Sequence, residues 1–276
     1  MSNYNKYRKY KSLYKTTLPP SIAIGAGSNQ PHSITEKPND ILGCKRVVYF
    51  FDNDANNFVD YTRCICVIPI EIPESKRIAT PYGNYAFTDI NTYQNYISNL
   101  SPGAQLYANS VKKRKGIDSY DPISGISCKD LEDYTSKLNN NTFRDRLAAM
   151  IFDWDRTLTV MEGVPARYKS LSKLITHYQE KYDMSNSVSP RDIVEYYFGG
   201  NRRMLLIKKL GEALNGHNKL IYVLSANSGL SNHTDFFHEM LQIVGINIPV
   251  NHLIYKGNMS KYQYIEDALP NLCIGN

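Results

Sequence analysis

The second half of the chain alternates short apolar segments with longer segments of helical periodicity. Apolar runs over 147–154, 220–224 and 252–255 have the length and residue content of buried strands. Strands that alternate with helices predict a mainly parallel sheet covered by helices on both faces, a three-layer α/β sandwich. The helices expected between and after these strands cover 165–182, 189–197, 202–214, 235–244 and 261–269.

The first half of the chain is less regular. Apolar runs over 45–51 and 63–72 predict two further strands, and apolar residues at helical spacing predict a helix over 128–138. Residues 73–127 contain several prolines and glycines, which interrupt helices and strands. We therefore predict an irregular insertion or connection over 73–127.

Length and charge indicate how the chain is divided. Its 276 residues suit one large domain or two small ones. The net charge of +6 comes from 32 basic and 26 acidic residues, and residues 1–15 hold five of the basic ones and no acidic one. We expect a basic, tyrosine-rich arm and linker over 1–40, then a single, nearly neutral domain over 41–276. A small helical cap or insertion is predicted over 160–218.

Several features bear on the compartment. No run approaches the roughly 18 apolar residues of a membrane span, and no apolar segment follows the N-terminal charges as in a secretory signal. Cys64 and Cys66 are two apart on a predicted strand and so point to opposite faces. We expect free thiols in a reducing compartment, hence an intracellular, cytoplasmic protein without membrane contact. The basic run over 112–115 resembles a nuclear import signal.

The sharpest chemical feature is Ile-Phe-Asp-Trp-Asp-Arg-Thr-Leu-Thr over 151–159. An apolar strand runs directly into Asp153 and Asp155, and the carboxyl ends of parallel strands form the crevice where α/β sheets bind ligands. One carboxylate can attack as a nucleophile while the other transfers protons. Mg²⁺ would offset their repulsion. The structural alternative is that Asp153 only begins a turn or caps a helix.

This segment resembles the first motif of the haloacid dehalogenase (HAD) superfamily, whose commonest activity is phosphate hydrolysis through an aspartyl-phosphate. The resemblance implies a HAD-like, Rossmannoid fold with Asp153 as nucleophile and Asp155 as general acid/base. The segment 220–227, which ends in Ser-Ala-Asn, resembles the second motif. By this resemblance Ser225, Asn227 and Thr157 would bind the phosphate.

The third motif of the family is a lysine near the start of a helix. Lys261 matches it best, with Lys256 as the rival. The fourth motif should follow, but the segment there, 271–276, ends in Asn276 where an acid is expected.

A better match to the fourth motif lies before the first one. The segment 47–58 has the acid-acid-x-x-x-Asn form, with Asp52 in the first acidic place and Asn57 in the Asn place. Asn53 stands where a second acid is usual, and Asp54 is expected to compensate. The order fourth, first, second, third implies a circularly permuted HAD core in which the strand 45–51 lies beside the strand 151–154. The alternative is a turn rich in Asp and Asn.

These motifs predict a Mg²⁺-dependent phosphohydrolase that acts on a phosphomonoester of unspecified class. The expected metal ligands are Asp153, Asp155, Asp52 and Asp54. A catalytically impaired HAD-like scaffold is the alternative, since Asn53 and Asn276 weaken the metal site. A third reading is nucleic-acid or polyanion binding through residues 1–15. Arg202 and Arg203, at the start of a predicted helix, would either bind an anion or point to solvent.

Overall fold

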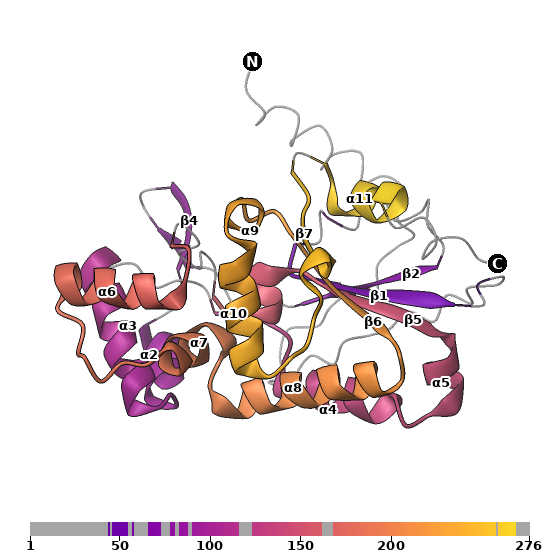
Figure 1. The fold of residues 1–276 in the computed structure, drawn as a ribbon, viewed down its shortest axis with the longest axis horizontal. Coiled ribbons are helices and arrows are strands. Elements are labelled where there is room, and N and C mark those ends of the chain that lie inside the picture. The colour runs from indigo at the N-terminus through magenta and orange to yellow at the C-terminus, as the bar shows by residue number, and fades with distance from the viewer. Residues whose placement is uncertain are drawn as a thin grey trace, which may run out of the picture. The chain divides into compact units, whose positions relative to one another are not determined.

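The computed structural model describes one part of the chain (Figure 1). The chain divides into two compact units, Met1–Ser33 and Ile34–Asn276, and every described residue belongs to the second. The predicted arm over 1–40 therefore lies outside the described residues. The structure describes residues 44, 46–54, 57, 66–72, 78–80, 83–87, 90–115, 123–161, 168–257 and 259–268.

Five strands form one sheet in which every neighbouring pair is parallel, as predicted. The order across the sheet is β2 (Val67–Glu71), β1 (Val47–Asp52), β5 (Leu147–Phe152), β6 (Leu220–Ser225) and β7 (Leu253–Tyr255). β1 pairs with β5, with Phe51 opposite Phe152. The prediction that the strand at 45–51 lies beside the strand at 151–154 is therefore confirmed.

Helices cover both faces of the sheet (Figure 1). All six residues of β1 are buried, as expected for a strand covered on both faces. The predicted helices that cover the sheet are α4 (Cys128–Lys137), α8 (Asn201–Gly216), α10 (Thr234–Val244) and α11 (Lys261–Ala268). The odd-numbered residues of β1 belong to a core on one face of the sheet, which also contains residues of α4, α8 and α10. Val48 and Phe50 belong to a second core on the other face, which also contains Ile265 of α11.

Beside the sheet, further helices pack on one another. α3 (Pro102–Lys115) contacts α2 (Ile90–Ser98), α6 (Leu171–Tyr182) and α7 (Pro190–Phe198). The prediction of an irregular 73–127 segment was therefore wrong for α2 and α3. Pro102 occupies the first helical turn, where its missing N–H costs no hydrogen bond, so it starts α3 instead of breaking it. Ala104, Tyr107, Ala108 and Val111 then form its buried face.

The remaining elements are short. They are β3 (Ile78–Thr80) and β4 (Gly83–Phe87), which form an antiparallel pair, α5 (Asn141–Arg146), the π-helical turn η3 (Trp154–Leu158), α9 (Gly229–Asn232) and the 3₁₀ turn η4 (Val250–His252).

Two cysteines are joined, contrary to the expectation of free thiols. Cys44 precedes β1, Cys66 precedes β2, and their sulfurs form a disulfide with the Cα atoms 5.6 Å apart. The pairing arises because β1 and β2 are neighbours in the sheet, so their entry points lie side by side. Cys128 is free, while Cys64 and Cys273 lie outside the described residues. In the described part of the chain no helix is long and apolar enough to cross a membrane.

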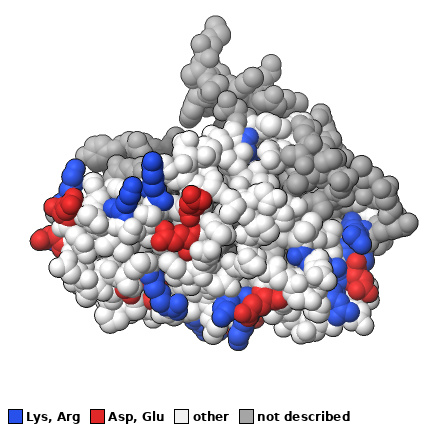
Figure 2. Space-filling view, in the orientation of Figure 1, with Lys and Arg blue, Asp and Glu red and all other residues white. Residues whose placement is uncertain are grey.

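Charge is mixed on the described surface. On the face in Figure 2, acidic and basic side chains lie beside one another and do not form a field of one sign. The basic run over 112–115 forms the last turn of α3, where Lys113 pairs with Asp183 at 3.3 Å. Its role in nuclear import remains a prediction.

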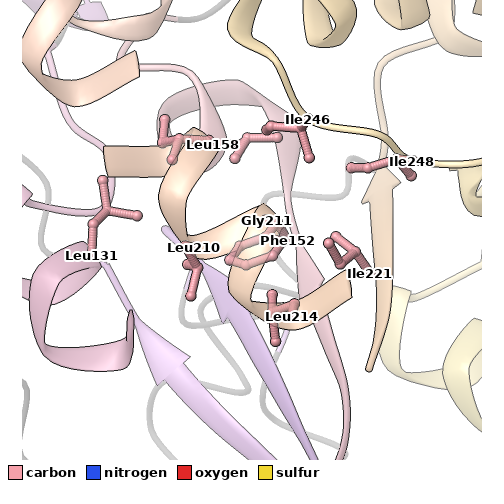
Figure 3. Close-up of a pocket in the computed structure, with 10 residues that line it drawn as sticks. Leu131, Phe152, Leu158, Leu210, Gly211, Leu214, Ile221, Ile246 and Ile248 are labelled. Carbon is pink, nitrogen blue, oxygen red and sulfur yellow. The ribbon is translucent and has the colours of Figure 1, made fainter. Parts of the chain in front are cut away.

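A small apolar cavity lies between α8 and the sheet (Figure 3). It has a volume of about 20 Å³ and is lined by Phe152 of β5, Ile221 of β6 and Leu214 of α8, among other apolar residues. Without polar lining groups a cavity of this kind stays dry. It is therefore a packing defect of the core, and the candidate site lies elsewhere.

Candidate functional site

Three central strands of the sheet end in polar side chains. Asp52 is the last residue of β1, Asp153 directly follows β5, and Ser225 is the last residue of β6. Because the three strands are parallel neighbours, these residues meet at one edge of the sheet. All three side chains are buried, so this edge holds carboxylates that are shielded from bulk water.

A buried lysine joins two of these carboxylates. Lys261 is the first residue of α11, and its Nζ lies 2.9 Å from Asp52 Oδ2 and 2.6 Å from Asp153 Oδ1. The rival Lys256 donates from its Nζ to the carbonyl oxygen of Met259 instead, at 2.7 Å. Lys261 is thus the lysine that the fold brings into contact with both Asp52 and Asp153.

Asp52 is fixed by further donors. The backbone N–H of Asp54 donates to Asp52 Oδ1 and Asn57 Nδ2 donates to Oδ2, each at 2.9 Å. Asp54 therefore contributes its backbone to the site, while its side chain is exposed. Asn53 accepts a long hydrogen bond of 3.4 Å from the hydroxyl of Thr157, which links the β1 end to the segment after β5.

The chain turns sharply after Asp153. Residues Trp154–Leu158 form a turn with the hydrogen-bond spacing of a π-helix, because the N–H of Leu158 donates to the carbonyl of Asp153 at 3.1 Å, but the backbone angles of Asp155 and Arg156 are not helical. Arg156 in this turn has φ +58°, an uncommon conformation for a residue other than glycine. Trp154 is fully buried against Phe198 and Phe237.

The end of β6 contacts Asp155. Asn227 donates from Nδ2 to Asp155 Oδ2 at 3.2 Å, and its backbone N–H donates to Ser225 Oγ at 3.1 Å. Asn227 also accepts from the N–H of Gly229 at 2.9 Å, which fixes its amide. Asn227, expected on the phosphate, therefore holds Asp155 in the structure.

Burial dominates the electrostatics of this cluster. Burial raises the pKa of Asp153 to about 7, against the attraction of Lys261, and it also raises the pKa of Asp52. Burial alone would lower the pKa of Lys261, but the attraction of Asp153 and Asp52 raises it. The ammonium is therefore firmly charged, and it only partly compensates the two carboxylates.

The chemistry of the donors fits Mg²⁺. Asp52, Asp153 and Asp155 supply hard carboxylate oxygens, and one ammonium leaves them with excess negative charge. The described residues contain no group of three His, Cys, Asp or Glu side chains arranged around one metal position. Mg²⁺ does not need one, because it is usually held by one or two carboxylates together with waters and substrate phosphate oxygens.

No family model, curated protein or solved structure was found to match the chain. A HAD-like assignment therefore depends on the motifs and on the geometry of this site.

The two arginines near the start of α8 differ from the prediction. Arg202 is exposed and pairs with Glu132 at 3.3 Å, whereas Arg203 is buried and bonds to backbone carbonyls. Arg203 thus fits neither the solvent-facing nor the anion-binding interpretation. Its sequence neighbours, Gly199 and Gly200, signal only a turn.

Proposed function

We propose that the chain is a Mg²⁺-dependent phosphohydrolase of the HAD type that acts through an aspartyl-phosphate. One observation carries the proposal. Asp153 is buried at the end of β5 with Lys261 Nζ 2.6 Å from its Oδ1, which leaves Oδ2 as the attacking atom. Asp155 and Ser225 are connected to the same edge through Asn227.

The circular permutation is part of this proposal. The segment that resembles the fourth motif forms β1, beside the β5 strand of the first motif, and β6 of the second motif flanks β5 on its other side. Lys261 of the third motif contacts both Asp52 and Asp153. The permuted order of the motifs is thus compatible with one site at one sheet edge.

The residues divide the chemistry among them. Asp153 Oδ2 attacks the phosphorus, a new O–P bond forms, and the bond to the leaving oxygen breaks while Asp155 donates a proton to that oxygen. Asp155 then takes a proton from water, which attacks the phosphorus, breaks the Asp153–phosphorus bond and releases inorganic phosphate. Lys261, Ser225 and Thr157 would bind and neutralise the phosphoryl oxygens.

The metal would be held by Asp153, the backbone carbonyl of Asp155 and Asp52. When bound, Mg²⁺ supplies positive charge that stabilises the negative phosphoryl group and its transition state. Asp54, whose carboxylate is exposed, remains a predicted ligand from the sequence.

The test uses Asp153→Asn, which keeps the shape of the side chain and removes the nucleophile. Hydrolysis of p-nitrophenyl phosphate with Mg²⁺ should be lost in this variant while its circular dichroism stays that of the wild type. The matched control is Asp145→Asn, an exposed aspartate on α5, which should turn over like the wild type. Chelation with EDTA should abolish activity, and added Mg²⁺ should restore it. Turnover by Asp153→Asn at the wild-type rate would exclude the nucleophile assignment.

A non-catalytic scaffold is the second candidate function. It is favoured by Asp52, whose two oxygens already accept three hydrogen bonds, and by Asn53 in the place of a second acid. A wild-type protein that shows no turnover of any phosphate ester in a broad panel, with or without Mg²⁺, would support this candidate.

A further inference from the structure

Arg203 is a buried cation that donates only to backbone carbonyls. It lies in the first turn of α8 with 4% of its surface exposed. Its Nη1 donates to the carbonyls of Leu158 (2.7 Å) and Phe198 (2.8 Å), its Nη2 to Thr157 (2.9 Å) and its Nε to Ile126 (2.9 Å). Four hydrogen bonds from one guanidinium use nearly all of its five donors.

No acidic side chain among the described residues pairs with Arg203. A buried charge is costly unless it is well hydrogen-bonded, and burial here lowers the pKa of Arg203 to about 10. Backbone carbonyls accept all four of the hydrogen bonds that Arg203 donates within the described part of the chain. A buried guanidinium is costly, so its presence here indicates that it serves to fix the positions of these carbonyls.

These carbonyls belong to three separate segments. Ile126 lies just before α4, Phe198 ends α7, and Thr157 and Leu158 belong to the π-helical turn that follows Asp153. The turn is also bonded to the first segment directly, because the N–H of Ile126 donates to the carbonyl of Thr157 at 3.1 Å. Arg203 therefore connects the turn to helices on both sides of it.

Two glycines make room for this guanidinium. Gly125 has φ +121°, and a Cβ there would lie 3.0 Å from Arg203 Nη2 and 3.1 Å from the carbonyl of Thr159. Gly199 has φ +84°, and its Cβ would lie 3.0 Å from Arg203 Cδ. The backbone around Arg203 is thus closed tightly enough to exclude even a methyl group without rearrangement.

The turn needs such support. Arg156 adopts a left-handed conformation, which is strained for a residue with a Cβ. Asp155 and Thr157 flank it, so a relaxation of Arg156 would displace both side chains from the sheet edge. We propose that Arg203 is a positioning residue that holds the turn after Asp153, and with it Asp155 and Thr157, in the geometry that phosphoryl transfer requires. Its catalytic consequence rests on the proposed phosphohydrolase function.

The first measurement needs no variant and no activity. In the wild-type protein, hydrogen exchange should show the amides of Leu158 and Thr159 protected to the same level as those of β5. Much faster exchange in this turn than in β5 would overturn the proposal, because it would show that the turn opens readily although Arg203 is present.

The second measurement uses Arg203→Lys, with Arg202→Lys as the matched control. Lysine keeps the charge, but its donors are all on one nitrogen, so it cannot bond at once to carbonyls in three segments as the planar guanidinium does. In Arg203→Lys the amides of Leu158 and Thr159 should exchange faster, and kcat for p-nitrophenyl phosphate should fall by about 100-fold with a smaller change in KM. Arg202→Lys should change neither quantity, since Arg202 is exposed and pairs with Glu132.

The outcomes separate the two proposals. Unchanged exchange over 153–161 in a folded Arg203→Lys variant would overturn the role of Arg203. A wild-type protein without phosphatase activity would overturn the proposed function, while the exchange data would still decide whether Arg203 holds the turn. If Arg203→Lys does not fold, the wild-type exchange measurement decides alone.

Discussion

Asp153→Asn should stabilise the protein at alkaline pH while it removes the proposed nucleophile. The carboxyl of Asp153 has a pKa raised from 3.8 to about 7, chiefly by burial. Its charged form is therefore disfavoured in the folded state relative to the unfolded state. An amide has the same shape and no charge to desolvate, so the substitution should relieve this cost.

The magnitude and its pH window follow from the pKa values. Below pH 3.8 the carboxyl is protonated in both states and costs nothing. As pH rises from 3.8 towards 7 the unfolded state ionises first, so stability is lost across this window and stays constant above it. At about 1.4 kcal/mol per pH unit, the loss above pH 7 is at most about 4 kcal/mol. At pH 4 the same difference falls below about 1 kcal/mol.

The assay is urea unfolding of both proteins at pH 8 and pH 4, followed by the fluorescence of the single tryptophan, Trp154. Comparison of the two proteins at each pH cancels the contribution of every other titrating group. A variant that is less stable than the wild type at pH 8 would refute the reasoning. It would mean that the attraction between Lys261 and Asp153 outweighs burial and that the pair stabilises the fold.

Two further predictions concern the site lysine and the apolar cavity. Lys261→Met removes the ammonium that contacts both carboxylates, so the free energy of unfolding in urea at pH 8 should fall by about 3–5 kcal/mol. This loss of stability should be smaller at pH 5, because the carboxyls then take up protons. A loss of stability that does not depend on pH would contradict the role of charge. Leu214→Ala enlarges the cavity beside α8 and should cost about 2–5 kcal/mol in the same assay, whereas Leu205→Ala, exposed on the same helix, should cost far less. Equal losses for the two leucines would show that α8 does not pack as described.

Periodicity predicted most of the elements but only part of their arrangement. Buried parallel strands appear in sequence as short apolar runs, and all five strands of the sheet were predicted in this way. The prediction that β1 and β5 are neighbours was made from the motifs, because periodicity carries no information on strand order. The same gap hid the disulfide, since Cys44 and Cys66 become neighbours only when β1 and β2 pair.

Residue preferences misled the prediction at two points. Pro102 and Gly103 suggested a break, yet Gly103 is needed because a Cβ there would lie 2.3 Å from Asp192 Cγ, where α3 approaches α7. Arg203 was expected either to bind an anion or to point to solvent, yet its side chain is buried. Both cases depend on the close approach of segments far apart in sequence, which local patterns do not record.

The site shows the same division. The strand-end argument for Asp153 and the motif resemblance for Asp52 and Ser225 predicted that the three residues share one edge, and the ends of β1, β5 and β6 lie at one edge in the structure. The sequence left Lys256 and Lys261 as alternatives, because both follow β7 within a few residues, Lys256 in the turn and Lys261 at the start of α11. The structure distinguishes them by the contacts of their ammonium groups.

The pairing of Asp52 with Lys261 also has a consequence for how the protein folds. The two residues are 209 positions apart, so their contact closes one of the largest loops that the chain can form. Contacts of such high sequence separation slow folding, and during synthesis the strand that carries Asp52 emerges long before its partner lysine. Until residue 261 has left the ribosome, Asp52 and Asp153 have no ammonium between them and remain hydrated or protonated. The site therefore acquires its native charge balance only after all five strands of the sheet have been synthesised.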